Sequence, residues 1–98
     1  MICTYTIYSA HLDRYYIGAC QGGLDERIKA HNTSKYGSHH FTAKANDWEL
    51  YLALPCKDYS HAIRLERKIK SMKSRKYLEN LKKYKEMRER IIIETSLI

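Results

Sequence analysis

Three side chains in this sequence, an arginine, a histidine and a glutamate, are of types that together could hydrolyse a phosphodiester bond. Arg27 offers a planar fork of N–H donors for a non-bridging phosphate oxygen, where negative charge accumulates as water attacks. His31 follows Arg27 by four residues, so both lie on one helix face and could converge on one phosphate. Alone, Arg27 would be a surface arginine, and a lone histidine at position 31 would more often be structural.

Glu66 could supply the carboxylate for a divalent cation, because Mg²⁺ is commonly held by one carboxylate, water and substrate phosphate. It belongs to a helix predicted from Asp58, a plausible N-cap, to about Lys73. Apolar residues recur there every three or four positions and form one stripe: Ala62, Leu65, Ile69 and Met72. Glu66 lies on that stripe, so its carboxylate points toward the expected core and needs a partner. The alternative is an ion pair with Lys70 at i+4.

The elements that must position these side chains are predicted from the residue pattern. Tyr-, Ile- and Thr-rich runs over Cys3–Ala10 and Arg14–Cys20 predict a β-hairpin. A short helix follows over about 24–32, and residues 33–46 form a polar loop or irregular helix. Alternation from Trp48 through Leu50, Leu52 and Leu54, stopped by Pro55, predicts a third strand with one strongly apolar face.

Two further helices are predicted in the last quarter of the chain. One begins at Ser74, and its apolar members are Tyr77, Leu78, Leu81 and Tyr84. The other spans about Met87–Ile93. The predicted fold class is therefore α/β of the α+β type, a small, three-stranded, mainly antiparallel sheet flanked by helices.

The net charge of +7 is carried entirely by the C-terminal part of the chain. Residues 1–56 hold five basic and five acidic residues, whereas residues 57–98 hold 13 basic and six acidic ones. A one-sided basic surface favours a polyanion partner, nucleic acid before anionic membrane, although a solvated helix face is the simpler interpretation.

Length, cysteine usage and hydropathy exclude several protein classes. Ninety-eight residues fit a single domain. Three widely spaced cysteines without a C-x-x-C pair argue against a disulfide framework and a common zinc site, and favour a reducing cytoplasm. We expect no membrane-spanning segment, because no stretch approaches about 20 apolar residues.

Three motifs, in the order in which they occur along the chain, resemble those of the GIY-YIG endonuclease family. Tyr16-Ile17-Gly18 matches the second family motif, and residues 24–32, LDERIKAHN, are similar to its L-x-x-R-[L/I]-x-x-H-N helix. Residues 62–70, AIRLERKIK, resemble the helix that presents the family's metal-binding glutamate. The resemblance covers about residues 3–82, with a helical extension over 83–98, in one domain spanning 1–98.

This sequence departs from the family pattern at the first motif, because it contains no G-I-Y. Tyr5 has the family's spacing from Tyr16, whereas Tyr8 follows an isoleucine and looks more like the motif. We favour Tyr5 and keep Tyr8 as the alternative. Tyr5 shares a sheet face with Tyr16 only if paired residue numbers in the hairpin sum to an odd value.

The resemblance implies a metal-dependent endonuclease that hydrolyses DNA, with catalytic residues Tyr5, Tyr16, Arg27, His31 and Glu66. Glu66 would bind Mg²⁺ or Mn²⁺, and one of the two tyrosines would activate the attacking water. Relatives include homing, restriction and DNA repair nucleases and junction resolvases. Ala19 replaces a lysine found in some relatives, and His40 matches a histidine used in part of the family or belongs to an exposed pair.

The missing G-I-Y and Ala19 motivate an alternative, a catalytically weak module that keeps the fold and binds nucleic acid. A protein-interaction domain using residues 91–93 is the weakest hypothesis. The sequence leaves open the natural DNA substrate and whether the protein is a monomer or a weak dimer.

Overall fold

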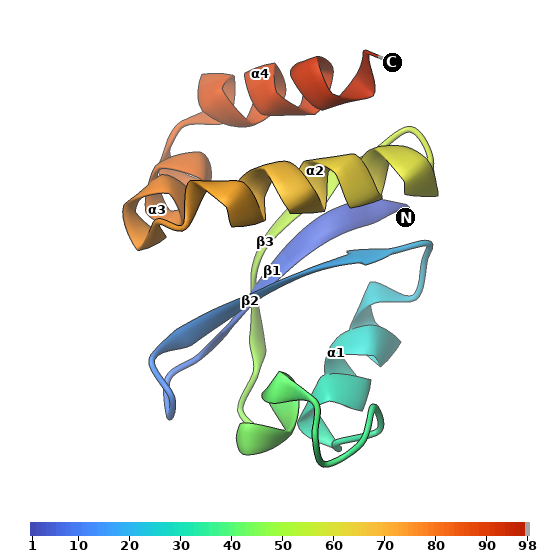
Figure 1. The fold of residues 1–98 in the computed structure, drawn as a ribbon, viewed down its shortest axis with the longest axis vertical. Coiled ribbons are helices and arrows are strands. Elements are labelled where there is room, and N and C mark those ends of the chain that lie inside the picture. The colour runs from blue at the N-terminus through green and yellow to red at the C-terminus, as the bar shows by residue number, and fades with distance from the viewer. Residues whose placement is uncertain (98) are drawn as a thin grey trace.

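The computed structural model describes residues 1–97, which form three strands, four α-helices and one short 3₁₀ helix (Figure 1). The observed α+β architecture confirms the predicted fold class. In chain order the elements are β1 (Cys3–Ser9), β2 (Arg14–Cys20), α1 (Leu24–Asn32), η1 (Phe41–Lys44), β3 (Glu49–Pro55), α2 (Tyr59–Met72), α3 (Arg75–Lys83) and α4 (Lys85–Ser96).

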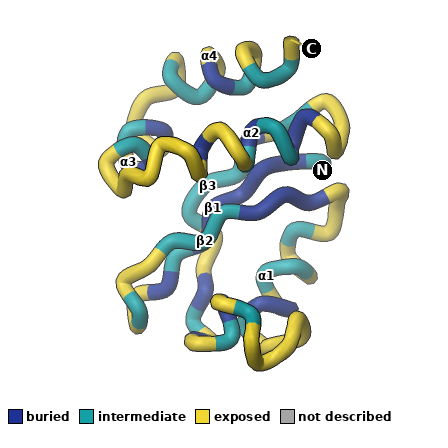
Figure 2. The backbone as a smooth tube through the Cα atoms, viewed as in Figure 1, coloured by how far each residue is buried: buried dark blue, intermediate teal, exposed yellow. Residues whose placement is uncertain are grey.

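The sheet is antiparallel with the order β2-β1-β3, so β1 is central and β2 is an edge strand. The hairpin between β1 and β2 turns through Asp13, whose φ is 53°. Because β2 has no strand on its outer side, side chains from opposite faces of the sheet can meet around that edge. Figure 2 shows β1 buried along most of its length, as expected for a central strand covered on both faces.

Helices cover both faces of the sheet (Figure 1). The face of Tyr5 and Ile7 packs with α1 and the segment around η1, and its buried residues include Cys3, Cys20 and Trp48. Thr4 lies on the opposite face, where its hydroxyl donates a 2.7 Å hydrogen bond to the Ala62 carbonyl of α2. That side holds the second core, in which α3 and α4 pack against α2 and β3. Its buried residues are Leu54, Leu65, Ile69, Leu78, Leu81 and Ile91.

Local signals explain where the helices begin. Gly23 adopts φ 63° and ψ 45° before α1, a left-handed conformation that glycine accepts without steric cost. The Asp58 carboxylate accepts the His61 N–H at 2.7 Å at the start of α2. Ser74 accepts the Tyr77 N–H at 3.1 Å at the start of α3. Both expected N-caps are therefore confirmed.

The α2 stripe differs from the prediction at its ends. Ala62, Leu65 and Ile69 are buried as expected, but Met72 is 43 % exposed because it lies in the last turn of the helix. His61 is buried instead, with its Nε2 2.9 Å from the Thr95 hydroxyl on α4.

Two predictions about the C-terminal helices are corrected. Tyr84 is 47 % exposed, because it lies at the junction of α3 and α4 and ends the buried face of α3. The last helix, α4, is also longer than predicted, running from Lys85 to Ser96. Its Ile91 is buried in the core, whereas Ile93 is 58 % exposed.

The third strand does not present one continuous apolar face. A register irregularity at Thr6/Ile7 pairs Thr6 with Leu52 but Ile7 with Leu50, so Leu50 and Leu52 face opposite sides of the sheet. Leu50 is 47 % exposed, whereas Leu54 is buried. The prediction of one apolar face is therefore wrong.

None of the helices formed by residues 1–97 is both long enough and apolar enough to span a membrane.

Candidate active site

The hairpin register separates the two candidate tyrosines of the first motif. Tyr5 pairs with Gly18, so the paired residue numbers sum to an odd value and Tyr5 lies on the same face as Tyr16. Tyr8 pairs with Tyr15 on the other face, and its hydroxyl donates to the Asp13 carboxylate at 2.5 Å. The strand geometry therefore groups Tyr5, and not Tyr8, with Tyr16.

Gly18 makes room for the Tyr5 ring. A Cβ atom built on Gly18 would lie 2.6 Å from the Tyr5 hydroxyl oxygen and 2.7 Å from Cζ, closer than any side chain could approach. The glycine of the Tyr-Ile-Gly motif is thus required because the aromatic ring of the paired strand lies across its backbone.

The Tyr5 hydroxyl joins Arg27 and His31. It lies 2.8 Å from His31 Nε2, and Arg27 Nε–H donates to it at 3.3 Å. Tyr5 is only 1 % exposed, and burial raises the pKa of its phenol well above the usual value despite the neighbouring guanidinium. The phenol therefore keeps its proton, and its O–H donates to His31 Nε2.

His31 is enclosed and uncharged at neutral pH. It is 2 % exposed, and burial lowers its pKa to about 4, with a smaller contribution from His40 and Arg27. Its Nδ1 lies 2.8 Å from the Thr42 hydroxyl. Both ring nitrogens of His31 are thus used within the protein.

Thr42 continues the hydrogen-bond chain to His40. The Thr42 N–H donates to His40 Nδ1 at 3.2 Å, which makes that nitrogen an acceptor, and the Thr42 hydroxyl lies 2.9 Å from it. All groups are satisfied when the Thr42 O–H donates to His40 and Thr42 Oγ1 accepts Nδ1–H of His31. His40 is half-buried and caps η1, whereas His39 is exposed, so the two do not form an exposed pair.

The sequence predicted that Arg27 and His31 converge on one phosphate, and the structure corrects the place where they meet. The two side chains meet at the Tyr5 hydroxyl and not at an open phosphate position, because His31 is buried between Tyr5 and Thr42. Arg27 is half-buried and uses Nε for this contact, which leaves its two Nη groups for another partner.

Aromatic rings surround His31 on its outer side. The ring centroids of Tyr16 and Tyr36 lie 5.0 and 4.8 Å from that of His31, and the Arg27 guanidinium carbon lies 5.7 Å from the Tyr36 centroid. The sequence did not single out Tyr36 or Thr42. The only signal for Tyr36 was an aromatic residue within a polar loop, and for Thr42 its proximity to His40.

Glu66 and Lys70 reach this site from α2, on the other side of the sheet, around the edge of β2. Glu66 is half-buried, with 19 % of its side chain exposed, and its Oε2 lies 2.6 Å from Lys70 Nζ. That ammonium lies 5.9 Å from the centroid of the Tyr16 ring. Glu66 thus borders the buried stripe without entering the core, and the expected alternative ion pair with Lys70 is present.

Tyr16 lies between the two groups of side chains. It is half-buried, and burial raises the pKa of its phenol, while the Lys70 ammonium opposes that shift and Glu66 adds to it. Within residues 1–97 its hydroxyl makes no hydrogen bond, so it is the tyrosine of the pair that is available to solvent.

Comparison with known proteins assigns this arrangement to a family. A family model described as the GIY-YIG catalytic domain matches residues 1–85, a range that contains every candidate site residue. No curated protein and no solved structure matches the chain.

Proposed function

Because this chain belongs to the GIY-YIG catalytic domain family, whose domain implies a nuclease, we propose that it is a metal-dependent endonuclease that hydrolyses DNA phosphodiester bonds. The observation that supports this best is the hydrogen-bonded group of Tyr5, Arg27 and His31, flanked by Tyr16 and by Glu66 at the same strand edge. Each side chain has a distinct role in the proposed reaction.

Arg27 is the phosphate-binding residue. Its Nε is held by Tyr5, which leaves the two Nη groups to bind a non-bridging oxygen of the scissile phosphate. A guanidinium already held in place stabilises the negative charge that develops there without reorganising during the reaction. His31 is a positioning residue, since it is buried and holds the Tyr5 hydroxyl.

Tyr16 is the residue that orients the attacking water and accepts its proton. Its hydroxyl is free to bind water, whereas the Tyr5 hydroxyl is committed to His31 and Arg27. A phenol has an ordinary pKa of about 10, so a neighbouring cation must stabilise the phenolate near neutral pH. The Lys70 ammonium, 5.9 Å from the Tyr16 ring, acts in that direction.

The residues beside Tyr16 fit a divalent cation of the magnesium type. Among residues 1–97 no group of three or more His, Cys, Asp or Glu side chains could form a protein cage for a metal ion. A single half-buried carboxylate, Glu66, suits Mg²⁺ or Mn²⁺, which keep several waters and take oxygen ligands from substrate phosphate. When bound, the cation would neutralise phosphate charge and favour deprotonation of nearby water.

The test is cleavage of supercoiled plasmid DNA with and without Mg²⁺. We expect nicking only with the metal, and a loss of roughly 100-fold in rate for Glu66→Ala and for Tyr16→Phe. Glu79→Ala and Tyr8→Phe are matched controls, because Glu79 is an exposed residue of α3 and Tyr8 lies on the other sheet face. If Glu66→Ala cleaved DNA at the wild-type rate, the proposal that Glu66 binds the metal would be wrong.

A catalytically weak nucleic-acid-binding module is the second candidate. The close ion pair between Glu66 and Lys70 favours it, because an ammonium already occupies one oxygen of the proposed metal ligand. This function predicts DNA binding that weakens steeply with salt, and no nicking at any Mg²⁺ or Mn²⁺ concentration.

A further inference from the structure

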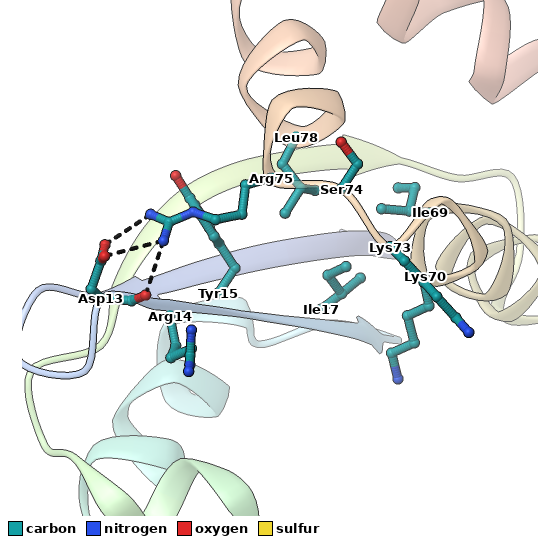
Figure 3. Close-up of a pocket in the computed structure, with 10 residues that line it drawn as sticks. All are labelled: Asp13, Arg14, Tyr15, Ile17, Ile69, Lys70, Lys73, Ser74, Arg75 and Leu78. Atoms are coloured by element: carbon teal, nitrogen blue, oxygen red, sulfur yellow. Dashed lines mark hydrogen bonds and ion pairs between the residues drawn. The ribbon is translucent and has the colours of Figure 1, made fainter.

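A pocket opens beside the candidate site, between the edge of β2 and the junction of α2 with α3 (Figure 3). Its volume is about 280 Å³, near the lower end of the range for small-ligand pockets. Ile17, Ile69 and Leu78 form an apolar floor, with Tyr15 beside them. The pocket is thus large enough for one small ring system above an apolar floor.

The rim of this pocket is strongly basic. It holds four cationic side chains and one carboxylate, that of Asp13. Asp13 is fully engaged by Arg75, whose Nη2 and Nη1 lie 2.8 and 3.1 Å from its two oxygens. Arg14 and Lys73 have no acidic partner among residues 1–97. An anion is therefore the complementary ligand, and a second copy of this basic chain is a poor one.

Lys70 connects the pocket to the candidate site. It lines the pocket, while its ammonium is paired with Glu66 and lies near the Tyr16 ring. Lys70 is therefore shared by the two places, and a DNA strand that passes from Tyr16 over Lys70 reaches this pocket.

An apolar floor beneath a basic rim is the combination that binds single-stranded nucleic acid, with cations on the phosphate and apolar or aromatic groups on the base. A base within a continuous duplex is covered by its neighbours and its partner, so it cannot enter a pocket. Only an unpaired nucleotide presents a phosphate and a free base face together.

We propose that this pocket binds an unpaired nucleotide next to the scissile phosphate, so that the substrate class is DNA with a single-stranded segment rather than continuous duplex. This inference rests on the proposed nuclease function. Lys73 and Arg14 lie at opposite ends of the pocket (Figure 3), so they bind the phosphates on the two sides of the unpaired nucleotide, and the floor formed by Ile17, Ile69 and Leu78 receives its base.

The test measures binding of the full chain in EDTA, so that cleavage does not interfere. One probe is a duplex with a single-stranded extension that carries 2-aminopurine at its first unpaired position. The other is a blunt duplex of the same length with 2-aminopurine paired in its centre. We expect about tenfold tighter binding of the first probe, and a change in 2-aminopurine fluorescence on binding for that probe alone.

The double variant Arg14→Gln with Lys73→Gln should abolish most of this preference. Arg67→Gln with Lys68→Gln removes the same charge from exposed positions of α2 that do not line the pocket. That control should weaken the binding of both probes equally and leave the preference for the single-stranded extension unchanged. Cleavage of both probes in Mg²⁺ is then measured separately, so a failure of the nuclease proposal is distinguished from a failure of the pocket.

Three results would overturn the proposal. The first is equal affinity for the two probes, and the second is unchanged fluorescence of the unpaired base on binding. The third is a DNA-independent dimer, seen by sedimentation, that the Arg14 and Lys73 substitutions dissociate, because the pocket would then be an interface between two copies. Preferential binding without any cleavage would support the pocket while contradicting the nuclease function.

Discussion

The buried hydroxyl of Tyr5 determines which neighbouring side chains are free to touch a substrate. It accepts a hydrogen bond from Arg27 Nε and donates one to His31 Nε2, while the Thr42 hydroxyl binds the remaining nitrogen of His31. Arg27 keeps two donor groups, whereas His31 keeps none. For this reason we propose Arg27, and not His31, as the phosphate contact, with His31 holding Tyr5 in place.

Burial of neutral His31 predicts a stability that depends on pH. The pKa of His31 is about 4 in the folded protein and about 6.5 in the unfolded chain. Between these values the unfolded chain binds a proton that the folded protein excludes, so stability falls as pH decreases from about 6.5 to 4. We expect His31 to account for a loss of up to about 3 kcal/mol over this window.

Urea unfolding at several pH values between 7.5 and 4 measures this dependence. The pH slope of His31→Gln should be smaller than that of the wild type, while His39→Gln, changed in an exposed loop, should keep the wild-type slope. Burial also lowers the pKa of His61, so His61 decreases stability at acidic pH in the wild type and in both variants alike. A native-state pKa near 6.5 for His31, followed by NMR, would contradict the prediction.

At the same scale, the sequence predicted residue types better than their contacts. Tyr5, Arg27 and His31 do lie together, because motif spacing specifies positions along a strand and a helix. Thr42 and Tyr36 were missed, since their contacts with His31 depend on how residues 33–46 fold back over α1. No periodic pattern encodes that path.

At the scale of elements, the pairing of β1 with β2 creates the site because it places Tyr5 across Gly18. Gly18→Ala would place a Cβ 2.6 Å from the Tyr5 hydroxyl oxygen and so push the ring away from His31 and Arg27. We expect a loss of about 1–3 kcal/mol in the free energy of unfolding, together with a large loss of DNA cleavage.

Gly22→Ala is the matched control, because its nearest atom to a built Cβ is the backbone nitrogen of Met1 at 3.9 Å. Urea unfolding and plasmid nicking of both variants provide the comparison. If Gly18→Ala were as stable and as active as Gly22→Ala, the close approach of the Tyr5 ring would not matter to the site.

The elements themselves were largely predictable from local patterns. The hairpin, the helix at 24–32 and the N-caps at Asp58 and Ser74 follow from residue types close together in the chain. That Leu50 and Leu52 face opposite sides of the sheet could not be foreseen, because it depends on a register irregularity between two strands, β1 and β3, that are far apart in the sequence. Long-range pairing leaves no local signal of that kind.

At the scale of the whole molecule, the candidate site joins two parts of the chain that differ in charge. Tyr5, Tyr16, Arg27 and His31 come from the electrically balanced part, whereas Glu66 and its partner Lys70 come from the basic part. Because β2 is an edge strand, side chains from α2 reach the other face of the sheet there. The excess basic residues of 57–98 can therefore flank a DNA backbone without crowding the reacting centre.

This separation predicts that charge removal far from the site weakens binding more than turnover. Three exposed lysines of α3 and α4 are changed to glutamine in one variant: Lys76, Lys83 and Lys85. The slope of log affinity against log salt should fall by about 0.9 for each phosphate that the variant no longer neutralises. The cleavage rate at saturating enzyme should change little, because none of these residues touches Tyr16, Arg27 or Glu66 within residues 1–97.

A second variant removes the same charge from exposed lysines of the balanced part: Lys29, Lys35 and Lys44. Fluorescence anisotropy over a range of salt concentrations gives both slopes, and single-turnover cleavage gives both rates. A docking surface on the C-terminal helices requires the larger decrease of slope in the first variant. Equal decreases in the two would mean that the +7 charge acts as a general field around the protein, and that α3 and α4 do not follow the DNA backbone.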